Sequence, residues 1–456
     1  MGSTGNPHVA LIAFPFGTHA APLFSLTAAL ATAAPSATFS FINSGRSNAS
    51  LARDISAVPS GANIRVYDIS DGCPDGYVLP VHNPEEEVGL FLQAAAVNIR
   101  EAMEKAVEGA GGRRISCIVS DAFIWFAGKM AEEMRVPWVP LWTGGPYSLA
   151  THMYTDFLRL KFGEQVTPSR LSEPLDCIPY MSALQVRELP EGIVFGNTDS
   201  VFARLVHSMA KELPHATTVA LNTFHGLDPA VDADLDTKFK HTLSIGPLHL
   251  LTPQPPQPAD SYGCVQWLDN HAPATVVYIS FGTIMSLPPP EAAALAEGLE
   301  ASGVPFIWSL KAAGQAYLPS GFLERTSGRG LVVPWVPQLK VLNHPAVGAF
   351  VTHCGWNSVM ESVTGGVPMI CRPFLGDQRL NAGVVSRVWK IGAGFEGGIV
   401  TTGAAEKALR LVLMEDGGKA MRERVGKLRE MAIGATKPGE SSTNNFQALV
   451  EVICGY

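Results

Sequence analysis

The sequence carries little charge and no long apolar run. Charged residues make up 16% of its 456 positions, whereas hydrophobic residues make up 46%. No stretch reaches the roughly 18 consecutive apolar residues that indicate a membrane span. The composition is therefore typical of a globular protein with large buried cores, and the length predicts two domains.

Basic residues are absent or scarce where targeting or polyanion binding would need them. The first 45 residues contain no Lys or Arg, so the apolar segment 8–16 lacks the positive flank of a signal or transit peptide, and we expect a strand there. The formal net charge is −8 and no basic cluster occurs, which argues against a nucleic-acid partner. We expect a cytoplasmic protein, monomeric and without membrane insertion.

Cysteine is also scarce, with seven residues in the chain and none in CxxC spacing. Neither a disulfide framework nor a zinc finger is indicated. His353 and Cys354 are adjacent, but neighbouring side chains diverge and no second His/Cys pair lies at ligand spacing. We identify no metal-binding Asp-x-Asp motif, and we expect neither a metal nor another cofactor.

Short runs rich in β-branched and aromatic residues alternate with helix-like stretches along the whole chain. This alternation predicts βαβ units, with near-continuous apolar strands in parallel sheets that helices cover on both faces. A Pro-rich stretch at 250–262 predicts a semi-rigid linker between a domain at 1–249 and a second at 263–440. Two doubly wound domains that face each other would form a cleft lined by the carboxyl ends of their strands.

The segment "GAFVTHCGWNSVMESV" predicts an anion site in the second domain. An apolar strand leads through a His-Cys-Gly turn into a helix, which we expect to begin near Asn357 or Ser358, both favoured caps. Unpaired N–H groups at a helix start favour a diphosphate, and His353 and the Ser358 hydroxyl add donors. Glu361, one turn on, could accept hydrogen bonds from a sugar diol, so a nucleotide ligand is favoured.

A histidine and an aspartate follow two strands of the first domain. His19 and Asp121 should both project from carboxyl ends of strands into the cleft. A histidine can take a proton from an acceptor hydroxyl, while a carboxylate holds its tautomer and stabilises the imidazolium. From the pattern alone, however, a structural role is the commoner explanation for such a pair.

The stretch from Trp335 to Gln378 resembles the signature box of plant UDP-dependent glycosyltransferases across its whole length. The resemblance extends over nearly the entire chain, and "FPFGTHAAPL", "DAFIWFA", "LPEGIVFGN" and "GDQRLN" are most similar to flavonoid 3-O-glucosyltransferases of that family. It implies an α/β fold of two facing Rossmann-like domains, the GT-B type, with a final helix at 441–456 that packs back on the first domain. It also implies inverting transfer of glucose from UDP-glucose to a hydroxyl of a flavonoid or related plant phenolic, most simply the 3-OH of a flavonol or anthocyanidin.

Carried over position by position, the resemblance makes His19 the general base and Asp121 its orienting carboxylate. In the family, Trp335 would stack on uracil, and Gln378 at the end of the box goes mostly with glucose donors, where His goes with galactose. The residues implied for UDP-sugar binding are Thr18, Thr143, Thr283, Ser309, Trp335, Val336, Gln338, His353, Trp356, Asn357, Ser358, Glu361, Asp377 and Gln378. Those implied for acceptor binding are Gly17, Phe123, His152, Phe195, Phe202 and Phe374.

Several alternatives stay open at this point. Gly17 stands where related flavonoid enzymes often carry a hydroxyl residue, which leaves the acceptor and the choice between O- and C-linkage undecided. UDP-galactose as donor and a non-catalytic nucleotide-sugar-binding protein are further readings. A dehydrogenase is disfavoured, because "GAGFEG" at 392–397 does not open a helix, and no G-x-S-x-G motif supports a serine hydrolase.

Overall fold

The computed structural model describes residues 6–57, 63–74, 77, 84–251, 260–283 and 285–455. Most of the predicted linker, at 252–259, lies outside these residues. The chain forms two compact units. The first comprises Met1–Val166, Glu191–Pro256 and Ala435–Tyr456, and the second comprises Thr167–Pro190 and Gln257–Gly434.

The first unit is built on a parallel sheet in the order β3-β2-β1-β4-β5-β6-β7. Its strands are β1 (His8–Ile12), β2 (Thr38–Ser44), β3 (Ile64–Ile69), β4 (Cys117–Asp121), β5 (Trp138–Trp142), β6 (Val219–Leu221) and β7 (Thr242–Ser244). β1, β4 and β5 are buried along their whole length, as expected for parallel strands covered on both faces. The order of the strands reverses between β1 and β4, which places the topological switch point at their carboxyl ends.

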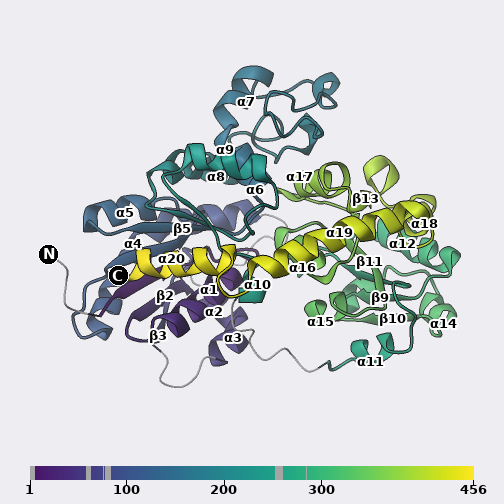
Figure 1. The fold of residues 1–456 in the computed structure, drawn as a ribbon, viewed down its shortest axis with the longest axis horizontal. Helices are drawn as coiled ribbons and strands as arrows, with labels where there is room; N and C mark the ends of the chain where they lie inside the picture. The colour runs from purple at the N-terminus through teal and green to yellow at the C-terminus, as the bar shows by residue number, and fades with distance from the viewer. Residues whose placement is uncertain are drawn as a thin grey trace. The chain divides into compact units, whose positions relative to one another are not determined.

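The first unit's helices come from all parts of its sequence. They are α1 (Ala20–Ala33), α2 (Gly45–Ser50), α3 (Ala52–Ser56), α4 (Pro84–Gly109), α5 (Ala127–Met134), α6 (Pro146–Met153), α7 (Thr155–Phe162), α8 (Val201–Glu212), α9 (Pro229–Lys238), α10 (Leu248–Leu251) and α20 (Ser441–Cys454). Of these, α1, α4, α5 and α20 pack on this sheet. Helix α20 packs on β7, β4 and β1, and Leu449, Val450 and Ile453 are buried in the same core as β1. Figure 1 shows this helix, in yellow, together with the elements of the first unit. The final helix is therefore part of the first unit.

The second unit repeats this plan with a parallel sheet in the order β10-β9-β8-β11-β12-β13. Its strands are β8 (Val276–Ser280), β9 (Phe306–Ser309), β10 (Gly330–Val333), β11 (Val347–Thr352), β12 (Met369–Cys371) and β13 (Gly392–Gly394). Its helices are α11 (Cys264–Leu268), α12 (Pro289–Ser302), α13 (Ala312–Gln315), α14 (Phe322–Thr326), α15 (Gln338–Leu342), α16 (Trp356–Gly365), α17 (Gln378–Gly383), α18 (Thr402–Leu413) and α19 (Asp416–Ala435). The switch point here lies between β8 and β11.

The segment Thr167–Pro190 lies in the sequence between two parts of the first unit, but it belongs to the second unit. Arg387, which follows α17, donates from Nε to the carbonyl of Ala183 at 2.8 Å and forms an ion pair with Glu188. Burial, and the nearby charge of Arg187 to a lesser extent, lower the pKa of the Arg387 guanidinium, which remains paired with the Glu188 carboxylate. This segment, called the strap below, departs from the predicted domain at 1–249.

The predicted fold class, two doubly wound parallel α/β domains, is confirmed. One local prediction is corrected: α16 begins at Trp356, one residue before Asn357, and its N-cap is Gly355, so neither Asn357 nor Ser358 caps it. The Ser358 hydroxyl instead accepts a hydrogen bond from Gln338. Among the described residues, no helix combines the length and apolarity needed to span a bilayer.

Candidate functional site

His19 and Asp121 meet at the switch point of the first sheet. His19 lies between β1 and α1, and Asp121 is the last residue of β4. The imidazole Nδ1 donates to Asp121 Oδ2 at 2.9 Å, while Asp121 Oδ1 accepts from the Phe123 N–H at 2.9 Å. The carboxylate is 1% exposed and the imidazole side chain is 23% exposed. A buried carboxylate on Nδ1 fixes the tautomer, so Nε2 is the nitrogen suited to accept a proton.

Thr143 completes this cluster from the end of β5. Its hydroxyl lies 3.2 Å from His19 Nδ1, the nitrogen that also faces Asp121. Gly17 and Thr18, in the loop before His19, are exposed, and Gly17 has a φ of 65°, a left-handed backbone conformation that glycine adopts readily. The structure therefore brings His19, Asp121 and Thr143 together, with Gly17 and Thr18 at the exposed side of the loop.

Aromatic rings continue from His19 into the first unit. The Phe123 ring lies 4.4 Å from the imidazole, and it contacts Phe202 at 5.5 Å and Trp142 at 6.0 Å between ring centroids. Trp142 in turn meets His152 on α6 edge-on at 6.0 Å. Three predicted acceptor residues thus fall in one aromatic cluster with the candidate base. Trp142, which sequence analysis missed, is a strand-end residue like Asp121, and that position was the available signal.

His152 has properties that suit a ligand contact. Its side chain is 5% exposed, and its Nδ1 has no hydrogen-bond partner within the part of the chain that the structure describes. Burial lowers the pKa of the imidazole to about 4, so the ring is neutral near pH 7. An unbonded ring nitrogen in an apolar setting can bind a hydroxyl or carbonyl group.

The two remaining predicted acceptor residues lie outside the aromatic cluster just described. Phe195 is partly buried in the loop before α8, where its carbonyl accepts from the Gly192 N–H at 2.8 Å. Phe374 belongs to the second unit, where it packs edge-on against Phe281 at 5.8 Å.

In the second unit, the turn between β11 and α16 holds His353 against two glycines. A Cβ on Gly355 would come within 2.5 Å of His353 Nε2, and one on Gly282 would come within 3.0 Å of Cε1. Burial lowers the pKa of His353 to about 4, and its Nδ1 has no hydrogen-bond partner among the described residues. A neutral imidazole with an orphaned nitrogen beside a helix N-terminus can donate to an anion. Thr283, exposed after β8, lies in the same loop as Gly282.

Glu361 lies on α16 in a polar network. The Gln338 amide donates to the Glu361 carboxylate and, at 3.1 Å, to the Ser358 hydroxyl, and it accepts from Tyr278 at 2.9 Å. Burial raises the pKa of Glu361 to about 7, although the Gln338 bond opposes this shift. With its amide engaged on both sides, Gln338 acts here mainly to orient Glu361.

The loop from β12 to α17 carries two of the predicted sugar-binding residues. Asn381 Nδ2 donates to Asp377 Oδ2 at 3.1 Å and to the Cys354 carbonyl at 3.0 Å. Gln378 Oε1 accepts from the Phe374 N–H at 2.9 Å. Asn381 therefore links this loop to the turn that holds His353, a role that sequence analysis did not assign although "GDQRLN" contains it.

The other predicted donor residues are spread along the carboxyl edge of the second sheet. Trp335 follows β10 and is 37% exposed, unusually open for tryptophan and available to stack on a base. Ser309 ends β9, and Val336 is buried beside Trp335. Trp356 and Asn357 open α16, where Trp356 is buried against Trp389 at 6.3 Å.

The Asp-x-Asp spacing does occur, which corrects the sequence analysis. Asp232, Asp234 and Asp236 lie on α9, but their carboxylates bond to neighbouring protein groups. Asp232 accepts from the Gly226 N–H at 2.9 Å, and Asp234 accepts from the Tyr154 hydroxyl at 2.8 Å. Nor does any group of three or more His, Cys, Asp or Glu side chains within the described residues have metal-binding geometry.

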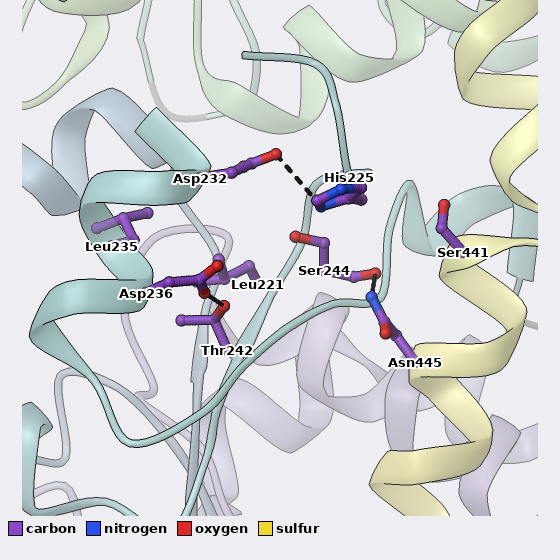
Figure 2. Close-up of a pocket in the computed structure, with 9 residues that line it drawn as sticks. All are labelled: Leu221, His225, Asp232, Leu235, Asp236, Thr242, Ser244, Ser441 and Asn445. Atoms are coloured by element: carbon purple, nitrogen blue, oxygen red, sulfur yellow. Dashed lines mark hydrogen bonds and ion pairs between the residues drawn. The ribbon is translucent and has the colours of Figure 1, made fainter. Parts of the chain in front are cut away.

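A pocket of about 290 Å³ lies beside α9 in the first unit (Figure 2). It is lined by Leu221, His225, Asp232, Leu235, Asp236, Thr242, Ser244, Ser441 and Asn445. Its polar groups already bond to one another: Asp236 to Thr242, Asn445 to the Ser244 carbonyl, and Asp232 to His225 at 3.5 Å. None of the predicted site residues lines it, so this pocket is separate from the candidate site.

Comparisons with known proteins place the chain in one family. A family model described as "UDP-glucoronosyl and UDP-glucosyl transferase" matches residues 79–430. The chain is 52% identical to an anthocyanidin 3-O-glucosyltransferase of Vitis vinifera, across 99% of this chain and 98% of that protein. It is 46% identical to an anthocyanidin 3-O-galactosyltransferase of Actinidia chinensis var. chinensis, across 100% and 98%. The crystal structure of a UDP-glucose: anthocyanidin 3-O-glucosyltransferase in complex with UDP has a TM-score of 0.92, 40% identity and 100% coverage of both chains.

Proposed function

Because the chain belongs to the UDP-glucoronosyl and UDP-glucosyl transferase family, we propose that it transfers glucose from UDP-glucose to the 3-OH of a flavonol or anthocyanidin. The observation that carries this proposal is the buried Asp121 carboxylate bonded at 2.9 Å to His19, at the end of the first sheet's central strands. The acceptor class is supported by relatives that act on anthocyanidins and by the aromatic cluster around His19.

In the proposed reaction, His19 Nε2 takes the proton of the acceptor hydroxyl while its oxygen attacks the anomeric carbon. Asp121 holds the imidazole through Nδ1 and stabilises the positive charge that develops on the ring. The displacement is in line, so the anomeric configuration inverts. UDP leaves as an anion, and the N-terminus of α16 with the neutral His353 N–H stabilises the charge on its phosphates.

The donor sugar is assigned to the loop that ends in Asp377 and Gln378. Gln378 favours glucose by the pattern of the family, although a galactosyltransferase also lies among the relatives. Gln378 Oε1 is engaged by the Phe374 N–H, so its NH₂ group is the part suited to donate to a sugar hydroxyl.

We also propose that the reaction needs no divalent metal and that the protein is a cytoplasmic monomer. The helix N-terminus and His353 supply the charge stabilisation that a metal gives elsewhere. EDTA at millimolar concentration should therefore leave the rate of UDP release unchanged. Loss of activity in EDTA with recovery on adding Mn²⁺ would contradict the metal-free mechanism.

The direct test is product analysis by mass spectrometry with UDP-glucose and a panel of quercetin, kaempferol and cyanidin. Wild type should add one hexose, and NMR should place a β-linked glucose at the 3-oxygen. The His19→Ala variant should bind UDP as wild type does and form no product. Binding of UDP-glucose with no transfer to any phenolic would contradict the proposal and favour a nucleotide-sugar-binding protein.

A further inference from the structure

A buried ion pair in the second unit lies behind the loop that carries the proposed sugar-binding residues. Arg372, the first residue after β12, donates from Nε to Glu291 Oε2 at 2.7 Å and from Nη2 to Oε1 at 2.5 Å. The two side chains are 12% and 13% exposed. A pair that is withdrawn from water to this extent holds its geometry closely, because separation would leave each charge buried without its partner.

Glu291 is also bonded away from the loop. It lies in the first turn of α12, and its Oε2 accepts from the Val400 N–H at 2.8 Å, just before α18. Burial alone would raise the pKa of this carboxyl, but the bonds from Arg372 and Val400 and the guanidinium charge hold the pKa below its usual value. Glu291 is therefore an ionised anchor that joins three segments of the second unit.

Arg372 in turn fixes the amino end of the loop that carries Asp377 and Gln378. Its backbone N–H donates to the Thr352 carbonyl at 2.8 Å, and its Nη1 donates to the Pro373 carbonyl at 2.6 Å. Its guanidinium also lies over the Phe374 ring, 4.7 Å from the centroid. The position of the Pro373–Phe374 backbone thus depends on where Glu291 holds the guanidinium.

From Phe374 the constraint reaches the residues that face the donor sugar. The N–H groups of Phe374 and Leu375 both donate to Gln378 Oε1, at 2.9 and 3.3 Å. Displacing Phe374 would release the Gln378 amide from this bond and let it rotate. Gln378 would then no longer present its NH₂ group at a fixed place, and the neighbouring Asp377 would move with the loop.

We propose that Glu291 is a positioning residue for the donor sugar, acting through Arg372 on the loop that carries Asp377 and Gln378. This role rests on the proposed function, since it presumes that the loop binds the sugar of a UDP-sugar. Glu291 itself contacts neither the sugar nor the reacting atoms. Its effect should be strongest on the sugar half of the donor, because the residues proposed for uridine and phosphate lie on other segments.

The test compares Glu291→Gln with Glu300→Gln. Glu300 lies on the same helix and also pairs with an arginine through both oxygens, at 2.6 and 3.0 Å from Arg325, but that pair is solvent-exposed. Glu291→Gln should raise the KM for UDP-glucose about tenfold and move the ratio of kcat/KM for UDP-glucose over UDP-galactose toward one. Inhibition by UDP, which has no sugar, should stay within about twofold of wild type. Glu300→Gln should match wild type in all three.

Arg372→Lys is the second variant, because it keeps the charge but loses the bidentate bond and the stacking on Phe374. It should also move the ratio of kcat/KM for UDP-glucose over UDP-galactose toward one. If Glu291→Gln does not fold, this variant tests the positioning role in its place. An unchanged ratio in a folded variant would overturn the positioning role, as would UDP inhibition that weakens as much as UDP-glucose binding. Wild type that fails to use any UDP-sugar would refute the proposed function itself, which separates the two failures.

Discussion

Two histidine–aspartate pairs in the first unit have hydrogen bonds of similar length, through Nδ1 of His19 and Nε2 of His207, but different surroundings. His19 pairs with Asp121 at 2.9 Å, where the carboxylate is 1% exposed. His207 pairs with Asp156 at 2.7 Å, where the carboxylate is 71% exposed. Water screens the exposed pair, whereas the buried carboxylate can hold one tautomer of its histidine and stabilise a developing charge.

Asp121→Asn should therefore lower kcat by about 10²- to 10⁴-fold, because the amide can turn its NH₂ group to Nδ1 and place the proton on Nε2. Asp156→Asn makes the same chemical change and should leave kcat unaltered. Both are measured by UDP release at saturating donor and acceptor. An Asp121→Asn enzyme with wild-type kcat would contradict the role of Asp121 in orienting His19.

Glu361 should make donor binding depend on pH. Its pKa is raised to about 7, and in the proposed complex the ribose diol would donate to the ionised carboxylate. Below pH 7 the carboxyl must lose a proton when the ribose binds, so the KM for UDP-glucose should rise as the pH falls, by up to about tenfold per pH unit. UDP-glucose is the suitable ligand because its diphosphate does not titrate in this range. Glu361→Gln should flatten the profile; a profile identical to wild type would contradict the assignment.

At the level of residues, sequence alone could place His19, Asp121 and His353 because each follows an apolar strand, and strand ends define the edge of a parallel sheet. It could not show that Gln338 is committed to Glu361 and Tyr278, since those bonds join segments far apart in the chain. Nor could it reveal Asn381 or Glu291. Their partners come from other segments, and only the folded backbone brings the groups together.

At the scale of helices and strands, the turn from β11 into α16 requires a glycine, which has no side chain, at position 355. Gly355 has φ −62° and ψ 141°, a conformation that alanine adopts without strain, so only the space beside His353 requires glycine. Gly355→Ala should displace the imidazole and raise the KM for UDP-glucose about 10- to 100-fold, the worth of one hydrogen bond to a charged group. The melting temperature should change little.

Gly403→Ala is the matched control, because a Cβ at that position on α18 meets nothing within 4 Å. It should keep the KM of wild type. If Gly355→Ala also kept it, the close packing of His353 would have no part in donor binding.

Strands with continuous apolar runs were all predictable, whereas the edge strands β7 and β13 were not. Each has three residues, and Gly392–Gly394 contains no β-branched side chain to signal a strand. The bounds of helix α12 were predictable, because prolines mark its start and Gly303 its end. The start of α16 was placed too late because Asn357 or Ser358 was expected to cap the helix, whereas its N-cap is Gly355.

Across the whole molecule, the chain passes between the units at four points, not at one linker. The strap, Thr167–Pro190, and the terminal stretch from Ala435 each belong with the unit that is more distant in sequence. Hydrophobic periodicity reports that a segment is buried but not against which sheet, so the sequence could not assign them. The Pro-rich stretch is one of several boundaries.

This connectivity determines where two related proteins can be joined to make a stable hybrid. A hybrid made by a single junction in the Pro-rich stretch takes its strap from one parent and Arg387 from the other. Arg387 forms an ion pair with Glu188 and donates to the Ala183 carbonyl, both in the strap. Such a hybrid should melt at a lower temperature than either parent. One that exchanges 167–190 and 257–434 together, with four junctions, should regain the parental value and carry the donor preference of the transplanted unit. The structural units that can be exchanged are therefore not the two halves of the sequence on either side of the Pro-rich stretch.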